Sequence, residues 1–368
     1  MPSCSRRIVG RSRAMKLVIF GLAVSSSWGN GHAVLWRALI RAFARRGHQT
    51  VFFERDTPYY AQHRDLTDLE GGHLVLYKSW DDVLRFAKRE LADADAGMVT
   101  SYCPDALGAT ALVLEAPCLH VFYDLDTPVT LAQLAAGQAV GYIAPDGLSP
   151  FDLVLSYTGG AALHALRQQL GARRIAPLYG SVDPNHYRPA LLPGAPRAAL
   201  SYLGTYSDDR QAALEVLFIE PARRWPHAHF VIGGAQYPNH FPWSPNILFW
   251  RHVASSDHPR FYASARCTLN VTRQAMAASG WCPSGRLFEA AACGTPILSD
   301  WWEALDEFFA PDQEILVVET TADVLRALER SDAELARLGA AARERALTAH
   351  TAERRAAELE MLLSQRWE

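Results

Sequence analysis

The most chemically informative stretch begins at Ser284 and reads SGRLFEAAACGTPILSD. Its apolar spacing predicts a helix over 285–292, and a helix N-terminus offers unpaired N–H groups and a partial positive charge to a diphosphate. Arg286 could add a two-pronged contact to phosphate oxygens. Glu289, one turn after Gly285, could accept hydrogen bonds from both hydroxyls of a ribose. A structural interpretation also exists, because a Glu in a first turn favours the helix dipole and could pair with Arg286.

A second polar stretch, SSSWGNGH, joins a predicted buried strand to a predicted helix near the N-terminus. Ligands of doubly wound folds bind beyond the carboxyl ends of the strands, so this loop faces the expected cleft. Gly29 and Gly31 form a G-x-G pattern, but Val34 occupies the third glycine position. The acidic residue about twenty positions on is an isolated Glu54, which argues against a dinucleotide site. His32 is either a general base or a residue that fixes the turn, and the sequence leaves both open.

Two carboxylates follow the predicted strand at 119–123. If the chain stays extended, Asp124 and Asp126 point the same way, toward the cleft. One of them could then accept a proton or bind sugar hydroxyls. The alternative needs no function, since Asp126 or Thr127 could cap the next helix with Pro128 in its first turn. We favour capping for one of the two carboxylates, without a choice between them.

Short apolar strands alternate with helices on both sides of a proline-rich segment at 177–196. Before it, strands are expected at 16–20, 49–53, 73–77, 97–100, 119–123 and 152–156, with helices at 33–46, 81–92 and 160–170. After it, strands are expected at 200–203, 229–232, 247–250, 267–271, 296–298 and 315–318, with helices at 208–218 and 285–292. This rhythm predicts an α/β protein with two parallel sheets. The chain after Thr321 is expected to be helical, with Asp323 and Ser331 as N-caps.

Composition excludes several classes of protein. A chain of 368 residues is long enough for two cores. Its 36 Lys and Arg against 39 Asp and Glu give a net charge of −3, which argues against sequence-independent nucleic-acid binding. Six scattered cysteines form no C-x-x-C pair, so we expect no zinc site and a reducing cytoplasm. No apolar run is long enough to span a membrane, although peripheral contact with its inner face stays open.

The stretch GRLFEAAACGTPILSD, with WWEALDEFFAPDQEILVV after it, resembles the donor-binding half of GT-B glycosyltransferases of the group 1 and group 4 type. Within these enzymes it is most similar to the CgeB-type (spore maturation protein) branch. SYLGTYSDDRQAAL and the pattern Gly31-His32 … Arg46-Gly47-His48 add to the resemblance. The similarity is specific over 200–320, looser over the first 50 residues and weak over 55–175.

The resemblance implies two Rossmann-like domains that face a central cleft. The expected parts are a basic extension at 1–14, an acceptor-binding domain at 15–178, a linker at 179–197, a nucleotide-sugar-binding domain at 198–345, and a helix at 346–368 that crosses back to the first domain. Leu362 and Trp367 are expected to anchor that last helix. The basic extension contains Arg6, Arg7, Arg11 and Arg13, and translation could begin at Met15.

The resemblance also implies roles for individual residues. Glu289 would hold the donor ribose, and Ser284, Gly285 and Arg286 would lie against the diphosphate. The opposite side of the pocket would be lined by Gly204, Thr205 and Arg210. Group-4 enzymes carry an E-x7-E pair, and we match its first position to Cys282, which has no carboxylate. This departure puts a retaining mechanism in doubt.

These observations predict a glycosyltransferase that moves a sugar from a nucleotide-sugar donor to an acceptor hydroxyl. A UDP-type donor is favoured, and the acceptor could be a glycan, lipid, protein or small molecule. Without a D-x-D motif in the second half, we expect Arg210, Arg286 and a helix dipole, rather than a metal, to stabilise the leaving diphosphate. No further cofactor is expected. An inverting reaction would use His32 or Asp126 as base, with Asp124 as a third candidate.

Two alternatives accompany this prediction. A protein of the same fold could bind a nucleotide-sugar, or serve as a scaffold, without turnover. A sugar-nucleotide epimerase could also use this fold.

Overall fold

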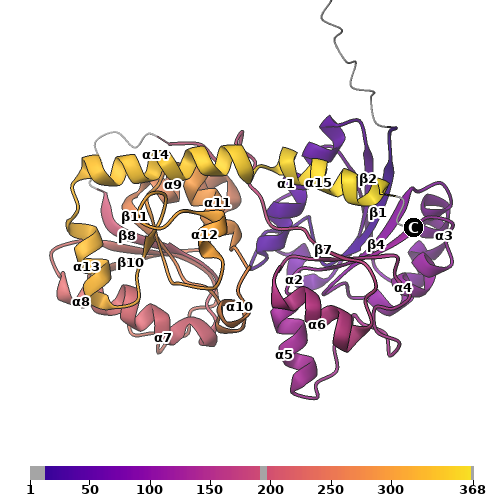
Figure 1. Ribbon diagram of the computed structural model, residues 1–368, viewed down its shortest axis with the longest axis horizontal. Helices are drawn as coiled ribbons and strands as arrows, with labels where there is room; N and C mark the ends of the chain where they lie inside the picture. Colours follow the sequence, from indigo (N-terminus) through magenta and orange to yellow (C-terminus); the bar gives the residue numbers. More distant parts are fainter. Residues whose placement is uncertain (1–12, 191–196, 366–368) are drawn as a thin grey trace, which may run out of the picture.

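Two α/β domains lie side by side in the computed structural model, which describes residues 13–190 and 197–365 (Figure 1). The first domain contains β1 (Lys16–Gly21), α1 (Gly31–Arg45), β2 (Gln49–Arg55), α2 (Pro58–Ala61), β3 (His73–Tyr77), α3 (Trp80–Ala92), β4 (Ala96–Thr100), α4 (Ala106–Leu114), β5 (Leu119–Asp124), α5 (Thr127–Ala135), β6 (Leu153–Ser156), α6 (Ala161–Leu170) and β7 (Ile175–Pro177). The second domain contains β8 (Ala198–Leu203), η1 (Asp208–Arg210), α7 (Gln211–Leu214), η2 (Glu215–Ile219), α8 (Glu220–Arg224), β9 (Phe230–Gly234), β10 (Ile247–Arg251), η3 (Ser255–Asp257), α9 (His258–Ala263), β11 (Ala265–Asn270), α10 (Gln274–Ser279), α11 (Gly285–Ala292), β12 (Ile297–Ser299), α12 (Leu305–Phe308), β13 (Leu316–Val317), α13 (Thr321–Glu329) and α14 (Asp332–Ala349). A last helix, α15 (Ala352–Ser364), returns to the first domain.

Both sheets are parallel and doubly wound. The first has the order β3-β2-β1-β4-β5-β6-β7, and the second has the order β10-β9-β8-β11-β12-β13. Apolar side chains pack on both faces of each sheet, as the near-continuous apolar strands predicted. The strand order reverses between β1 and β4 and between β8 and β11, and the carboxyl ends of strands at such reversals form the binding crevice of this fold class.

The predicted strands are all present, with ends that differ by at most two residues. The first sheet ends with β7 at Pro177, a short strand that the proline-rich composition concealed. The sequence did not predict α2, α4, α9, α10 and α12, because each is short or lacks a clear apolar period. The helix expected over 208–218 continues to Arg224. Its turn at Glu215–Ile219 is widened just before Pro221, which has no N–H to donate to the preceding turn.

The caps of the last helices are partly as predicted. Ser331 caps α14, and its hydroxyl accepts from the N–H of Glu334, whose carboxylate accepts from the Ser331 N–H in return. Asp323, however, is not an N-cap. Thr320 caps α13, and Asp323 is the third residue of the helix, where its carboxylate accepts from the Thr320 N–H at 2.8 Å. The predicted N-cap is therefore three residues too late. Thr320 and Asp323 form a capping box, in which both residues are typical of the first turn of a helix.

Helices α14 and α15 cross from the second domain to the first along one side of the molecule (Figure 1). The break between them lies at His350 and Thr351, so the boundary predicted at 345/346 falls within α14. Helix α15 packs on α1, and its side chains join the first core through Ala352, Ala356, Leu359 and Leu362. The other expected anchor, Trp367, lies outside the described residues, as do Arg6, Arg7 and Arg11.

Helix α15 offers a matched test of this packing. We expect Leu359→Ala to lower the free energy of unfolding by about 2–4 kcal/mol, because Leu359 is 1% exposed in the first core. Met361→Ala should change it by less than about 0.5 kcal/mol, because Met361 is 52% exposed on the same helix. Urea denaturation of both variants measures the difference. Equal stabilities, or a truncation after Thr348 that leaves stability unchanged, would contradict the docking of α15.

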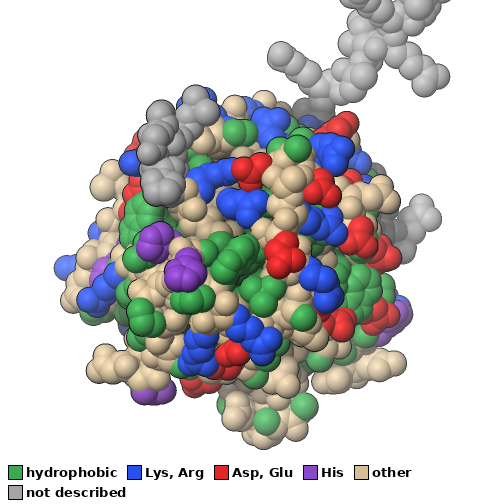
Figure 2. Space-filling view, turned by 90° about the vertical axis from the view of Figure 1, so that its left-hand side faces the viewer, with side chains coloured by type: hydrophobic (Ala, Val, Ile, Leu, Met, Phe, Trp, Pro, Cys, Tyr) green, Lys and Arg blue, Asp and Glu red, His purple; other side chains and the backbone are tan. Residues whose placement is uncertain are grey.

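The surface at the outer end of the second domain carries charges of both signs. Figure 2 shows positive and negative side chains interspersed with apolar ones on this face, without a continuous field of either sign. This mixture accords with the nearly balanced net charge of −3. Among residues 13–190 and 197–365, no helix combines the length and the apolar character needed to cross a membrane.

Candidate functional site

A cavity of about 450 Å³ lies between the two domains, at the carboxyl ends of both sheets. Loops that follow β1, β4 and β5 form one wall, and loops that follow β8, β9, β10 and β11 form the other. All predicted site residues except Asp124 line it: His32, Asp126, Gly204, Thr205, Arg210, Ser284, Gly285, Arg286 and Glu289. The carboxyl ends of the strands at the two order reversals therefore face the same cavity. Ligands of doubly wound sheets bind at such strand ends.

Helix α11 begins at this cavity. Its N-cap is Ser284, whose hydroxyl accepts from the N–H of Arg286, and both Ser284 and Gly285 line the space. A Cβ added at Gly285 would meet only Leu35 of α1 at 3.6 Å and Glu289 Oε1 at 3.9 Å. The first turn of the helix is therefore open to an occupant of the cavity, which its partial positive charge would attract if the occupant were anionic.

Glu289 lines the cavity although it is only 7% exposed. Its Oε2 accepts from the Tyr262 hydroxyl at 3.0 Å and lies 3.4 Å from His258 Nδ1, which leaves Oε1 on the side of Gly285. Burial by itself would raise the pKa of this carboxyl, but the bonds from His258, Tyr262 and Tyr187 hold the pKa below its usual value. Glu289 is thus a fixed, charged acceptor at the edge of the space.

Arg286 does not pair with Glu289, and its nitrogens are engaged elsewhere. Its Nη1 donates to the Leu203 carbonyl at 2.8 Å, its Nη2 donates to the Val271 carbonyl at 3.1 Å, and its Nε donates to the Ser284 hydroxyl at 3.1 Å. Its Nη1 also donates to the Tyr202 hydroxyl at 3.3 Å, so these four bonds leave one Nη2 N–H of the five guanidinium donors for a ligand. Arg286 is better described as a fixed positive charge that ties α11 to the ends of β8 and β11.

Two other arginines have freer nitrogens at the cavity. Arg210 donates from Nη1 to the Thr205 carbonyl at 3.0 Å, and its buried Nε has no hydrogen-bond partner within the part of the chain that the structure describes. Arg273 pairs through Nε with Asp209 at 3.0 Å and also lines the cavity. A buried donor without a partner is costly, so Arg210 favours an anionic occupant, and Arg273 adds a second positive charge at the cavity.

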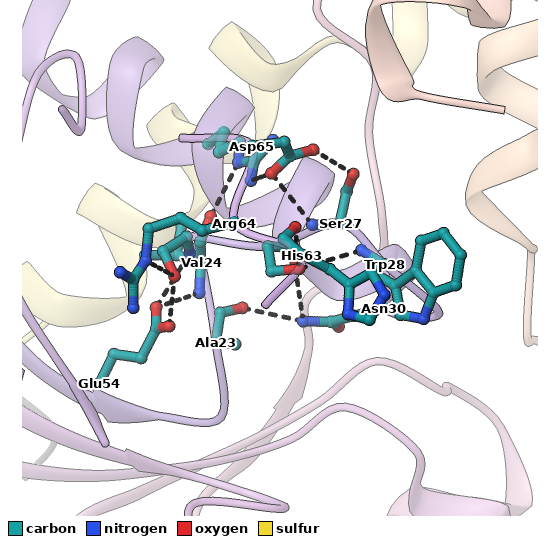
Figure 3. Close-up of polar contacts among 12 residues, drawn as sticks. Ala23, Val24, Ser27, Trp28, Asn30, Glu54, His63, Arg64 and Asp65 are labelled. Carbon is teal, nitrogen blue, oxygen red and sulfur yellow. Dashed lines mark hydrogen bonds and ion pairs between the residues drawn. The ribbon is translucent and has the colours of Figure 1, made fainter. Parts of the chain in front are cut away.

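The loop between β1 and α1 is held in place by two carboxylates (Figure 3). Glu54, at the end of β2, accepts from the N–H groups of Val24 and Ser25 at 2.7 and 2.9 Å. Asp65 accepts from the hydroxyl and the N–H of Ser27. The acidic residue that looked isolated in the sequence therefore anchors this loop, and the loop in turn fixes the start of α1.

His32 and Asp126 lie close together at the wall of the cavity that the first domain forms. His32 Nε2 lies 3.9 Å from Asp126 Oδ1, and the Tyr102 ring is stacked 6.4 Å from the His32 ring. Asp126 occupies the N-cap position of α5, yet its side chain makes no capping bond. The capping alternative therefore does not account for Asp126. Tyr102 has φ +64, a conformation that non-glycine residues adopt when their surroundings demand it.

Asp124 is placed differently from the prediction. It is fully buried, it does not line the cavity, and its Oδ1 accepts from the Thr130 hydroxyl at 3.1 Å and the Asp126 N–H at 3.2 Å. The chain turns at Leu125, whose N–H donates to the Ser101 hydroxyl, so the two carboxylates do not point the same way. The prediction that both reach the cleft is wrong for Asp124.

Burial raises the pKa of the Asp124 carboxyl to about 6. The folded state therefore binds this proton more tightly than the unfolded state, whose carboxyl has a pKa near 4. The protonated Asp124 carboxyl therefore adds to the free energy of unfolding at low pH. This contribution, at most about 3 kcal/mol, is lost as the pH rises from about 4 to 6. We expect Asp124→Asn to remove that decline. Urea denaturation of both proteins between pH 4 and 7 tests it, and parallel curves would contradict it.

Several residues that line the cavity were not predicted from the sequence. Tyr102, Arg273 and His258 each line the cavity, and each follows a strand of one of the two parallel sheets. The rule that ligands bind at carboxyl ends of strands, applied to every strand, would have selected them. The E-x7-E spacing also needs correction, because seven intervening residues place its first position at Trp281 rather than Cys282. Neither residue carries a carboxylate.

Comparisons with known proteins agree with this architecture. Residues 210–361 match a family model described as glycosyl transferase-like. Among curated proteins, none matches this chain in sequence. A sucrose-phosphate synthase from Thermosynechococcus elongatus superposes with a TM-score of 0.70 at 14% identity, over 95% of this chain and 98% of that one.

Two further structures contain nucleotide sugars. HepE of Anabaena, in complex with UDP-glucose, has a TM-score of 0.69 at 13% identity, over 95% of this chain and 99% of that one. An alpha-glucosyltransferase in complex with UDP-glucose and DNA has a TM-score of 0.69 at 12% identity, over 96% of this chain and 100% of that one. This chain therefore has the GT-B fold of glycosyltransferases, and its residues 210–361 match a glycosyl transferase-like family model.

Proposed function

We propose that this protein is a glycosyltransferase that binds a nucleotide-sugar in the cavity between its domains. The observation that carries the proposal is the open N-terminus of α11 beside the fixed carboxylate of Glu289. The helix end suits a diphosphate, and a charged acceptor beside it suits the two hydroxyls of a ribose. The family match over 210–361 and the UDP-glucose complexes of similar folds support a UDP-type donor.

In this proposal the second domain stabilises the leaving diphosphate without a metal. Arg210 and Arg273 would contact phosphate oxygens, while Arg286 contributes charge from a fixed position. Positive groups that are already in place stabilise charge as it develops, without reorganisation at the moment of reaction. We also propose that the protein belongs to the CgeB-type branch. Its proposed location is the cytoplasm or the inner face of a membrane.

The acceptor hydroxyl would lie against His32 and Asp126. Both side chains border the cavity, and at 3.9 Å Asp126 would stabilise the imidazolium that forms when His32 takes up a proton. This pair suits an inverting reaction, in which a base removes the acceptor proton as the sugar carbon is attacked. The absence of a carboxylate at both Trp281 and Cys282 favours the same outcome over retention.

Incubation of the purified protein with UDP- and GDP-sugars and a broad acceptor panel tests the proposal. We expect free UDP or GDP and a glycosylated acceptor. Saturable donor binding without nucleotide release would favour the scaffold alternative, and a released C2 epimer would favour an epimerase. A thermal-shift screen of UDP, GDP, ADP and TDP identifies the base, because a ligand that binds only the folded state raises its melting temperature.

A further inference from the structure

Two short segments from different domains run against each other beside the cavity. Residues 157–160 follow β6 in the first domain, and residues 281–283 precede α11 in the second. We call these two segments the seam. Three hydrogen bonds cross it: Tyr157 Oη donates to the Pro283 carbonyl at 2.9 Å, Thr158 Oγ1 donates to Cys282 Sγ at 3.2 Å, and the Gly159 N–H donates to the Trp281 carbonyl at 3.0 Å. Every residue of the second segment is thus held by one of the first.

The seam is buried except at Gly160 and Trp281, which are partly exposed. Cys282 is 2% exposed and belongs to the hydrophobic core of the first domain, although its chain segment comes from the second. Tyr157 and Thr158 are 5% and 0% exposed. Because water cannot replace a partner at such positions, an unmade hydrogen bond there is costly. The two segments therefore stay together unless the domains themselves separate.

Backbone geometry indicates that the second segment is shaped to fit the first. Trp281 has φ +43, a left-handed conformation that a tryptophan adopts only when its surroundings impose it. Its ring lies against Gly160, where an added Cβ would approach the ring to 2.2 Å. Trp281 also donates from Nε1 to Glu307 at 3.2 Å. The bend at Trp281 thus places Cys282 and Pro283 against the first domain.

The segment leads directly into the start of α11. Pro283 is followed by the N-cap Ser284 and by Gly285, and these are the residues that face the proposed diphosphate. We infer that Tyr157 and Thr158 of the acceptor domain are positioning residues for this donor site. They hold the segment that leads into the first turn of α11 against the first domain. The inference rests on the proposed function and adds that donor affinity depends on the first domain.

Loss of the seam should weaken nucleotide binding, and Thr158 tests this without a change to the cavity lining, whereas Tyr157 borders the cavity. We expect the double variant Tyr157→Phe/Thr158→Val to bind UDP roughly fivefold or more weakly than the wild type in calorimetry. The arrangement that binds would then be populated only in part, which raises the apparent dissociation constant by the inverse of that fraction. Thr158→Val alone should also weaken UDP binding. Thr158 is buried and does not line the cavity, so a lost ligand contact cannot explain that result.

Tyr123→Phe is the matched control. Tyr123 is also a buried tyrosine of the first sheet, and its hydroxyl donates to the Leu178 carbonyl at 2.6 Å without crossing to the second domain. We expect this variant to lose stability but to bind UDP as the wild type does. A control that loses UDP affinity to the same degree as the seam variants would overturn the inference, because the effect would then be general destabilisation.

The remaining outcomes separate this inference from the proposed function. If the wild type binds UDP and both seam variants bind it equally well, the seam has no positioning role while the proposed function stands. If the wild type binds none of UDP, GDP, ADP and TDP, both are wrong. Should the double variant fail to fold, the comparison of Thr158→Val with Tyr123→Phe decides the question, with melting temperatures as the measure of folding.

Discussion

Replacement of Glu289 by alanine should weaken donor binding by roughly ten- to hundredfold in a protein that still folds. The variant loses a charge-assisted contact worth about 1.5–3 kcal/mol. The carboxylate is held on Oε2 by Tyr262 and His258, so Oε1 is available to a ligand without further ordering. Isothermal calorimetry with a UDP-sugar measures the change. An unchanged dissociation constant would refute the ribose assignment.

Glu360 provides the matched control for that experiment. It is also a buried glutamate, 8% exposed, but it lies on α15 and pairs with Arg46, away from the cavity. Glu360→Ala should lower stability and leave donor affinity unchanged. A donor affinity that falls equally in both variants would show that burial of the charge, rather than its place beside α11, explains the effect.

Replacement of Asp126 by asparagine should lower the rate of sugar transfer by about a hundredfold or more while donor affinity stays the same. Asp126 and His32 line the cavity from the first domain, where the acceptor is proposed to bind, whereas the proposed diphosphate site is at α11 of the second. His32→Ala should have a similar effect on the rate. The measurement is nucleotide release in the presence of the acceptors, together with donor affinity by calorimetry.

Asp124→Asn separates position from charge in this test. Asp124 is a neighbouring carboxyl that is buried behind the cavity wall, so we expect its variant to keep most of the transfer rate. If both the Asp126→Asn and the His32→Ala variant transfer sugar at the wild-type rate, neither residue is the general base. A retained configuration at the sugar carbon would then be the expected stereochemical result.

The part of the cavity at α11 was predictable because its signals are local. The start of α11 at Gly285 and the place of Glu289 one turn later depend on a few consecutive residues, and the structure has both as expected. The alternation of apolar strands and helices likewise predicted two parallel sheets. Such patterns are visible in sequence because a helix or a buried strand repeats its requirements every few residues.

The errors concern contacts between residues far apart in the chain. Asp124 turns away from the cleft because Leu125 bonds to Ser101, which no spacing rule reveals. Most donors of Arg286 are engaged by groups that no spacing rule reveals, among them the carbonyls of Leu203 and Val271 near the ends of two other strands. Such long-range hydrogen-bond partners come together only when the sheet forms. They can be predicted from the sequence only if the order of the strands is known.

A crystal structure of the protein with a bound UDP-sugar tests the central claim most directly. We expect the diphosphate within hydrogen-bond distance, about 3 Å, of the N–H groups at Ser284 and Gly285. Both ribose hydroxyls should lie against Glu289. A nucleotide bound outside the cavity, or one whose ribose is turned away from Glu289 while its phosphates contact another loop, would contradict the account.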